Sequence, residues 1–431
     1  MRIAIVHEWL EGYAGSERVT EQLLAMFPGA DLFSLVDFVP PEHRHFLRGH
    51  TPRTSFIQGL PFAKRRFRSY LPLFPFAIQQ LDLAPYDLVI SCSHAVAKGV
   101  ITSPSQLHLS YVLSPMRYAW DLQGEYLRTS GLEHGVRGWL ARATLHRLRQ
   151  WDVASSHGVD RFVTVSQFVG RRIAKAYGRD ACVIPPPVDT DAFTPWGERE
   201  NYYLVMARQV PYKRIDLVVQ AFADMPERQL VVIGDGPETA KIRRMATKNV
   251  SILGHQPFEV VREHMRKARA FIYAAIEDFG IALAEAQAAG MPVIALCRGG
   301  AEDIVLGLET ETPTGVFFEE QTAEAIVAAV ECFESAEHRI HWRNCRDNAK
   351  RFSVAAFRSR MHGFIEEATE AQLTSGSGSR PLSLSRQSER TSGERRPVPN
   401  RKEPAIALGG RHLVEPVVLA GEGADAPAGG A

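Results

Sequence analysis

The stretch AFIYAAIEDFGIALAEAQAAGMPVIA, residues 270–295, has the pattern of a buried strand, a tight turn, a helix and a second strand. The apolar run 270–275 is short enough for a strand, and Gly280 permits a tight turn soon after it. Helical period follows and ends at Gly290, with Pro292 just beyond. A strand, a turn and a helix in this order form the repeating unit of a parallel, doubly wound sheet.

The same unit recurs along most of the chain. Further buried strands are expected at 3–6, 87–93, 108–113, 161–166, 201–207, 229–234, 250–254 and 292–296, and helices at 16–27, 214–225 and 238–246. Ser16 is the expected N-cap of the first helix. Two such series in tandem predict an α/β protein in which two Rossmann-like domains face a central cleft. Ligands are expected there, at the carboxyl ends of the strands.

Composition suggests where these domains begin and end. The proline-rich segment 183–195 predicts an interdomain connection, which gives domains of residues 1–190 and 191–352. Residues 353–373 have helical period and are expected to pack back on the N-terminal domain. Residues 374–431 are rich in Ser, Arg, Gly and Pro, so they cannot bury enough apolar surface to offset their ordering entropy. A disordered C-terminal tail is therefore expected.

Charge and cysteine content restrict the class of protein. Lys and Arg total 50 and Asp and Glu total 49, so the global basic excess of a nucleic-acid binder is absent. The five cysteines include no CxxC pair, which favours a reducing cytosol over a disulfide framework or a zinc site. The N-terminus lacks the apolar core of a signal peptide. No apolar run approaches the roughly 20 residues of a membrane-spanning helix, so any membrane association is expected to be peripheral.

Basic residues nevertheless cluster in two places. The clusters are Lys64, Arg65, Arg66 and Arg68, and then Arg137, Arg142, Arg147 and Arg149. One interpretation is a solvated helix face. The other is contact with anionic lipid headgroups or with a lipid-linked phosphate.

Two carboxylates flank the glycine turn of the opening stretch. Glu277 stands at the end of a strand, where it can reach sugar hydroxyls, and Glu285 lies about one turn inside the helix, where it can accept hydrogen bonds from a ribose diol. The N–H groups at the start of that helix, together with the helix dipole, suit a phosphate. The alternative is an ordinary strand-turn-helix unit with surface acids.

Other motifs at expected strand ends add polar groups to the cleft. Arg208 and Lys213, in MARQVPYKRID, suit a diphosphate and the charge that develops on it, although they also fit two solvated loop cations. Gly234, in GDGPE, permits close approach of a ligand to the backbone. In the first domain, Gly15 lies in a small-residue loop, and His94 comes just past a strand, where a structural histidine is the alternative.

The loop SPMRYAWD, residues 114–121, mixes aromatic and polar side chains, which suits carbohydrate because aromatic faces pack on sugar rings. Its candidate residues on the acceptor side are Arg117, Tyr118, Trp120 and Asp121. A well-packed loop without a ligand is the alternative.

Together these motifs resemble the family 4 glycosyltransferases, which have the GT-B fold. The resemblance rests on Glu277 and Glu285 with seven residues between them, Arg208 with Lys213, GDGP and the Gly15 loop. More narrowly, HEWL, SHAVAKG, PMRYAWD, PPVD, VPYKRID and EDFGIALAEA resemble bacterial GDP-mannose-dependent mannosyltransferases of O-antigen and capsular polysaccharide assembly. The resemblance covers about residues 1–370 and makes the first domain the acceptor domain and the second the donor domain.

The resemblance implies a retaining hexosyltransferase that moves a sugar from a nucleotide-diphosphate sugar to a lipid-linked oligosaccharide. It implies that Glu285 holds the ribose and Glu277 the donor sugar, and that His94 lies at the donor sugar near the reacting centre. It further implies that Arg208 and Lys213 bind the diphosphate, and that the backbone of Phe279, Gly280 and Ile281 contacts the sugar and the β-phosphate. No metal or other cofactor is expected, and Asp189-x-Asp191 in the linker is interpreted as structural.

Three alternatives stay open at this point. They are a UDP-sugar-dependent glucosyl- or galactosyltransferase, a GT-B sugar-nucleotide epimerase and a non-catalytic carbohydrate-binding protein. The VPYKR and EDFGIALAE motifs disfavour the last two. The expected location is the cytoplasm, with peripheral contact on the inner face of the cytoplasmic membrane.

Overall fold

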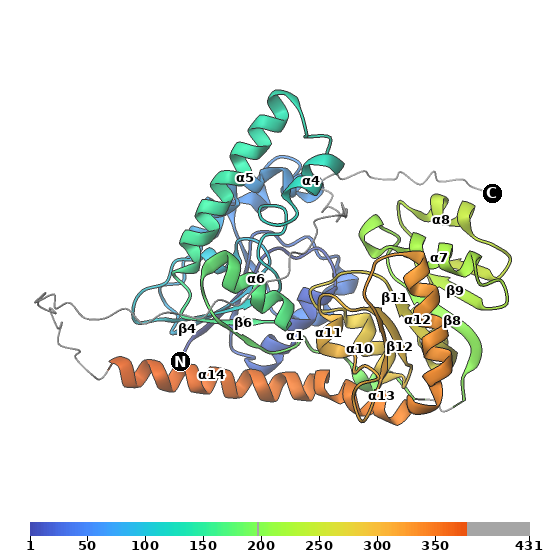
Figure 1. The fold of residues 1–431 in the computed structure, drawn as a ribbon. Coiled ribbons are helices and arrows are strands. Elements are labelled where there is room, and N and C mark those ends of the chain that lie inside the picture. Colours follow the sequence, from blue (N-terminus) through green and yellow to red (C-terminus); the bar gives the residue numbers. More distant parts are fainter. Residues whose placement is uncertain (196–197, 377–431) are drawn as a thin grey trace, which may run out of the picture.

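Two parallel β-sheets, each packed between helices, form the computed structural model, which describes residues 1–195 and 198–376 (Figure 1). The predicted α/β fold with two Rossmann-like domains is confirmed. Residues 377–431, most of the expected tail, lie outside the described residues. Within the described ranges, no helix is both long enough and apolar enough to cross a membrane.

The first sheet has seven strands in the order β3-β2-β1-β4-β5-β6-β7. Their bounds are β1 Ile3–His7, β2 Asp31–Ser34, β3 Arg53–Thr54, β4 Leu88–Ser93, β5 Leu107–Val112, β6 Arg161–Thr164 and β7 Ala181–Val183. Alternate residues of β1 enter different cores: Ile3 and Ile5 pack on one face of the sheet, and Ala4 and Val6 on the other. Because both faces are covered, the central strands β1, β4 and β5 are buried along their whole length instead of alternating between buried and exposed residues.

The helices of the first domain are α1 Gly15–Met26, α2 Ala63–Arg66, α3 Phe74–Gln79, α4 Gln123–Thr129, α5 Gly135–Ser156 and α6 Gln167–Tyr177, with 3-10 helices η1 Pro41–Leu47, η2 Phe56–Gly59, η3 Phe67–Leu73 and η4 Ala97–Gly99. The predicted N-cap was wrong, because α1 begins at Gly15 and Ala14 is its N-cap. The carboxylate of Glu17 accepts hydrogen bonds from the Ala14 N–H (3.0 Å) and from the Ser16 hydroxyl (2.9 Å). Glu17 therefore caps the start of α1, which is the role that we expected of Ser16.

The second sheet has six strands in the order β10-β9-β8-β11-β12-β13. Their bounds are β8 Glu200–Met206, β9 Gln229–Ile233, β10 Val250–Gly254, β11 Ala268–Tyr273, β12 Val293–Leu296 and β13 Gly315–Phe318. The helices are α7 Ile215–Ala223, α8 Thr239–Met245, α9 Phe258–Lys267, α10 Ile281–Ala288, α11 Ala301–Ile304, α12 Ala323–Ala336 and α13 Trp342–Ala349. In both sheets the strand order reverses beside the first strand, between β1 and β4 and between β8 and β11. Ligands bind at such switch points in open α/β sheets.

The last helix, α14 Val354–Gly376, carries the chain back beneath the first domain (Figure 1). Phe357 packs edge-on against Tyr111 of β5, with ring centroids 6.0 Å apart, and Arg358 donates hydrogen bonds to Gln22 of α1 at 2.5 and 2.9 Å. The two interdomain crossings lie side by side, because the Val188 N–H donates to the Phe352 carbonyl at 2.9 Å.

Candidate active site

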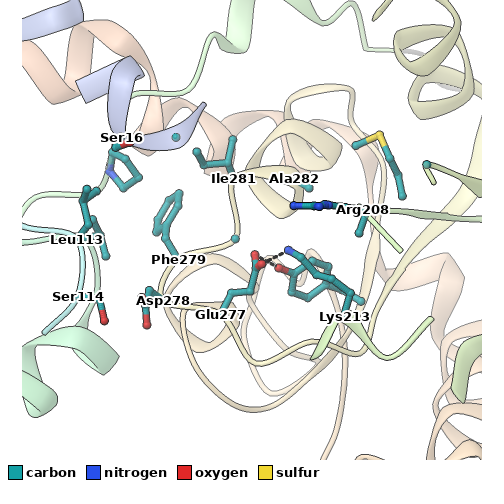
Figure 2. A pocket seen from close by; sticks show the side chains of 18 of the residues that line it. Ser16, Leu113, Ser114, Arg208, Lys213, Glu277, Asp278, Phe279, Ile281 and Ala282 are labelled. Carbon is teal, nitrogen blue, oxygen red and sulfur yellow. Dashed lines mark hydrogen bonds and ion pairs between the residues drawn. The ribbon is translucent and has the colours of Figure 1, made fainter. Parts of the chain in front are cut away.

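A cavity of about 1030 Å³ lies between the domains, at the carboxyl ends of strands from both sheets. Figure 2 shows Ser16, Leu113 and Ser114 of the first domain on one side and Arg208 and Lys213 of the second on the other. Eleven of the residues predicted from the sequence line it: His94, Glu277, Arg208, Lys213, Gly15, Gly234, Phe279, Gly280, Ile281, Arg117 and Tyr118. Three others, Glu285, Trp120 and Asp121, do not.

Glu277 is the central acid of the cavity. Its carboxylate accepts hydrogen bonds from the Lys213 ammonium and from the Tyr273 hydroxyl (Figure 2). The turn that follows needs glycine, because Gly280 has φ +96° and a Cβ there would lie 2.9 Å from a Leu283 methyl group. The turn thus leads from the carboxylate directly into the N-terminus of α10.

Two cations of the second domain face this acid. Arg208 is exposed and forms no ion pair with any residue that the structure describes, so its guanidinium is available to an anionic ligand. Lys213 is largely buried. Burial and repulsion from Arg117 lower the pKa of Lys213 to about 8, even though its ammonium pairs with Glu277. The lysine is therefore charged at neutral pH but close to losing its proton.

This gives a prediction for the pH dependence of catalysis. Below about pH 8 Lys213 carries the positive charge that its expected role at a leaving diphosphate requires, and above it the neutral amine does not, so the rate of the expected transfer should fall about tenfold per pH unit on the alkaline side. Initial rates across the alkaline range measure this. A Lys213→Arg variant keeps its charge and should lack the fall. An unchanged alkaline limb in that variant would assign the titration to another group.

The loop at Gly15 is held in place by buried charge. Glu17 accepts from His7 at 3.3 Å, in addition to its contacts with Ala14 and Ser16. Burial opposes a charge on this histidine, but its partners Cys92 and Glu17 raise the pKa of His7 to about 10. An ion pair between His7 and Glu17 therefore holds this loop in position. A Cβ at Gly15 would lie 3.2 Å from the Ile281 side chain, so two candidate donor-binding residues meet across the cavity.

His94 lies opposite Glu277, at the end of β4. Its ring packs edge-on against Trp9, with centroids 4.5 Å apart, and its Nδ1 atom is buried without a hydrogen-bond partner among the described residues. Burial lowers the pKa of His94, and the nearby Glu8 carboxylate offsets this only in part. Tyr118 lines the same cavity and also has a buried hydroxyl for which no partner is found within the described ranges. Both polar groups are candidates for contact with a ligand.

Glu8 holds the His94 loop, and sequence reasoning missed it. Its buried carboxylate accepts hydrogen bonds from the Ser93 hydroxyl and from the four backbone N–H groups of residues 94–97, at 2.7–3.0 Å. Burial alone would raise the pKa of Glu8, but His94 and these N–H groups together lower it. The sequence held two signals, the position of an acid directly after the first strand and its place in the HEWL motif, but neither gave Glu8 a role.

Glu285 lies at the interface between the two domains rather than in the wall of the cavity. Its Oε1 atom accepts from the Arg18 guanidinium of α1 at 2.8 Å, which leaves Oε2 without a hydrogen bond among the residues described. The structure therefore places this acid beside the first domain and keeps one of its oxygens available.

Trp120 and Asp121 were predicted on the acceptor side, and neither side chain lines the cavity. The Trp120 indole donates to Asp152 at 2.7 Å, and this carboxylate also pairs with the buried Lys98. Asp121 instead pairs with Arg172 of α6 at 2.5 Å. The two residues anchor the loop that carries Arg117 and Tyr118.

Asp278, beside Glu277, joins the two domains. Its carboxylate pairs with Arg117 and, at 2.9 Å, with Arg172, and its carbonyl accepts from the Ser166 hydroxyl at 2.5 Å. Arg117 was predicted on the acceptor side, and its guanidinium pairs with an acid of the second domain. The carboxylate of Asp278 thus ties the turn after β11 to the first domain.

An Asp278→Asn variant should open the cleft, because it removes the negative charge that faces both arginines. We expect a larger radius of gyration by small-angle X-ray scattering, with little change in melting temperature. Glu334→Gln is the matched control, since Glu334 pairs with Arg228 and Arg269 inside the second domain. A radius of gyration in the Asp278 variant equal to that of the control would show that this contact does not hold the domains together.

The acids of the linker lie away from the cavity. Asp189 accepts from the Ala192 N–H at 3.2 Å and caps a short 3-10 helix, and Asp191 lies 3.5 Å from Arg346. Over residues 1–195 and 198–376, no group of three or more His, Cys, Asp or Glu side chains is arranged to hold a metal ion.

Two Rossmann-like domains with acids and cations at the strand ends between them define the GT-B class. Residues 189–352 match the family model described as "Glycosyl transferases group 1", so the second domain is a glycosyl transferase group 1 domain. The sucrose-phosphate synthase of Thermosynechococcus elongatus has the same fold, with a TM-score of 0.64 at 18% identity over 86% of this chain and 100% of that chain.

Curated relatives match part of the chain. The GDP-mannose-dependent alpha-(1-6)-phosphatidylinositol monomannoside mannosyltransferase of Mycolicibacterium smegmatis is 29% identical over 228 residues, which are 45% of this chain and 57% of that protein. The corresponding monoacylated-substrate mannosyltransferase of Corynebacterium glutamicum is 31% identical over 178 residues, 34% and 47% of the two chains. This chain thus spans about half the length of the curated relatives that it matches.

Proposed function

We propose that this protein is a retaining glycosyltransferase that moves mannose from GDP-mannose to a lipid-linked oligosaccharide in surface polysaccharide biosynthesis. The observation that carries the proposal is the meeting of Glu277, Lys213 and Arg208 at strand ends, opposite His94. An acid for sugar hydroxyls and two cations for a diphosphate are the groups that a nucleotide-sugar donor needs. Two relatives are GDP-mannose-dependent mannosyltransferases by name, which favours GDP-mannose as that donor.

The donor would lie along the segment from Glu277 to Glu285. Glu277 would hold the sugar, and the N–H groups at the start of α10 would bind the β-phosphate. The available Oε2 atom of Glu285 would accept a hydrogen bond from a ribose hydroxyl while Oε1 keeps its contact with Arg18. Donor binding would therefore strengthen the contact between the domains.

Transfer would proceed on the face of the sugar from which the nucleotide leaves. The bond from the anomeric carbon to the phosphate oxygen breaks first, and Arg208 and Lys213 stabilise the charge that develops on the leaving GDP. The acceptor hydroxyl then attacks the same face, which retains the α configuration, and the departing phosphate takes its proton. The mechanism needs no protein nucleophile, and we propose that it needs no bound metal or other cofactor.

The acceptor would enter from the first domain, where Tyr118 offers a polar group to its sugar, and His94 would lie at the donor sugar near the reacting centre. A lipid-linked acceptor resides in a membrane, so the protein is proposed to work at the inner face of the cytoplasmic membrane through peripheral contact. This location follows from the chemistry of the acceptor.

Nucleotide protection tests the choice of donor. GDP at about 100 times its dissociation constant should stabilise the fold by about 2.7 kcal/mol, which thermal unfolding can detect. UDP at the same concentration should give much less protection. Stronger protection by UDP would replace GDP-mannose with a UDP-sugar, and protection by neither nucleotide would count against a nucleotide-sugar site.

A further inference from the structure

The segment FIQGLPFAKRRFRSYLPLFPF, residues 56–76, forms a distinct surface of the first domain, which we call the aromatic-basic segment. It runs through η2, α2, η3 and the start of α3. Its sequence holds four cations, Lys64, Arg65, Arg66 and Arg68, and no acid. The chain as a whole is nearly balanced in charge, so this segment is a local concentration of positive charge.

The apolar side chains on the inner face of this segment belong to the hydrophobic core. Phe67, Leu71 and Phe74 are buried in the core beneath the first sheet. The outer face is not explained in this way, because Phe62 is 78% exposed and Phe76 is 57% exposed. The ring of Phe56, itself exposed, lies 5.8 Å from the ring of Phe76, which makes the apolar surface continuous there. Contiguous exposed apolar groups rimmed by polar residues mark interaction sites.

The backbone at Phe62 provides a second, independent observation. Phe62 has φ +57°, in the left-handed region that bulky side chains rarely adopt. Strain of this kind persists where the surrounding structure enforces it, and it is concentrated at functional sites. The exposed ring gains no burial that would offset the strain, so its outward position is better explained by a contact outside the folded chain.

The cations beside Phe62 also lack ion-pair partners among the residues that the structure describes. Lys64, Arg65 and Arg66 are exposed, and none forms an ion pair within residues 1–195 and 198–376. Arg68, one turn further, lines the cavity and pairs with Glu11. The segment therefore runs without a break from an open basic surface to the wall of the candidate active site.

We propose that the aromatic-basic segment docks on the surface of an anionic lipid bilayer. The rings of Phe62 and Phe76 enter the interface between headgroups and acyl chains, and Lys64, Arg65 and Arg66 bind the headgroups. Membrane contact at this segment brings the cavity, through Arg68, next to the surface in which a lipid-linked acceptor lies. The benefit to transfer rests on the proposed function, whereas the docking itself does not.

Co-sedimentation of the full chain with vesicles tests the proposal. We expect binding to phosphatidylcholine vesicles that contain phosphatidylglycerol, and little binding to phosphatidylcholine alone. Each cation near such a surface contributes about fivefold in affinity, so the triple variant K64Q/R65Q/R66Q should bind roughly 100-fold more weakly. The double variant F62S/F76S should also lose binding, at an unchanged melting temperature.

Phe258→Ser is the matched control. Phe258 is 47% exposed on α9 of the second domain, so its loss removes an exposed ring far from the segment in sequence and should leave vesicle binding unchanged. Undiminished binding by the triple variant would overturn the proposal and assign docking to another part of the chain. Equal binding to neutral vesicles would overturn it as well. The vesicle assay contains no nucleotide sugar. Vesicle binding by a protein that transfers no sugar would therefore support docking at the aromatic-basic segment and reject only the proposed function.

Discussion

Replacing Glu277 with alanine should lower the rate of sugar transfer by about 100- to 1000-fold, the usual cost of removing one group that stabilises a transition state. The carboxylate stands at the end of β11 between Lys213 and Tyr273, where it is proposed to hold the donor sugar. The fold should survive, because the side chain faces a cavity and not the core. Initial transfer rates and melting temperatures of both proteins measure the two effects.

A control separates this role from a general effect of charge. Glu320 is an exposed acid of the same domain and lies outside the cavity wall, so Glu320→Ala should transfer sugar at the wild-type rate. If Glu277→Ala kept more than about a tenth of the activity, well above the loss expected for such a group, its assigned role would be wrong.

Replacing Glu8 with alanine should cost at least about 3 kcal/mol of folding free energy, because several buried N–H groups lose their acceptor and each such loss costs about 1–3 kcal/mol. These groups belong to residues 94–97, so His94 should also lose its position and transfer should fall. Denaturant unfolding measures the stability. Glu11→Ala removes only a half-exposed pair with Arg68 and should cost less than about 1 kcal/mol.

The stabilisation by Glu8 should also depend on pH. Its pKa is lowered in the folded state, so the stabilisation is present above the ordinary value of 4.5 and is lost as the pH falls through the lower, folded value. The difference in stability between wild type and Glu8→Ala should therefore shrink in acid. A difference that stayed constant across the acid range would mean that the charge on Glu8 contributes nothing.

The fold class was predictable because short, mainly apolar runs alternate with helical segments along the chain. Strands such as Leu88–Ser93 and Leu107–Val112 are buried along their whole length, and only small polar residues or a histidine interrupt their apolar sequence. Strands β2, β3, β7 and β13 were not predicted. They have two to four residues each, and runs of that length are recognised only where apolar neighbours extend them, as at 161–166 and 292–296.

The candidate site was predictable where a residue directly follows a strand. His94 directly follows β4, and Glu277 lies in the loop just beyond β11, so both were found because the carboxyl ends of parallel strands meet at one edge. The contacts of Glu285 with Arg18 and of Trp120 with Asp152 were not predicted, because the orientation of a helix and the path of a loop depend on tertiary packing. The pairing of Asp278 with Arg172 joins residues 106 positions apart, and no spacing rule predicts such a contact.

Sugar transfer itself is the most direct test of the proposed function. Purified full-length protein would be incubated with a lipid-linked oligosaccharide acceptor and, in separate reactions, with GDP-mannose, UDP-glucose and UDP-galactose. We predict release of GDP and an α-linked mannosyl product from GDP-mannose alone. Neither transfer nor hydrolysis with any of these nucleotide sugars would contradict the assignment of this cavity to glycosyl transfer.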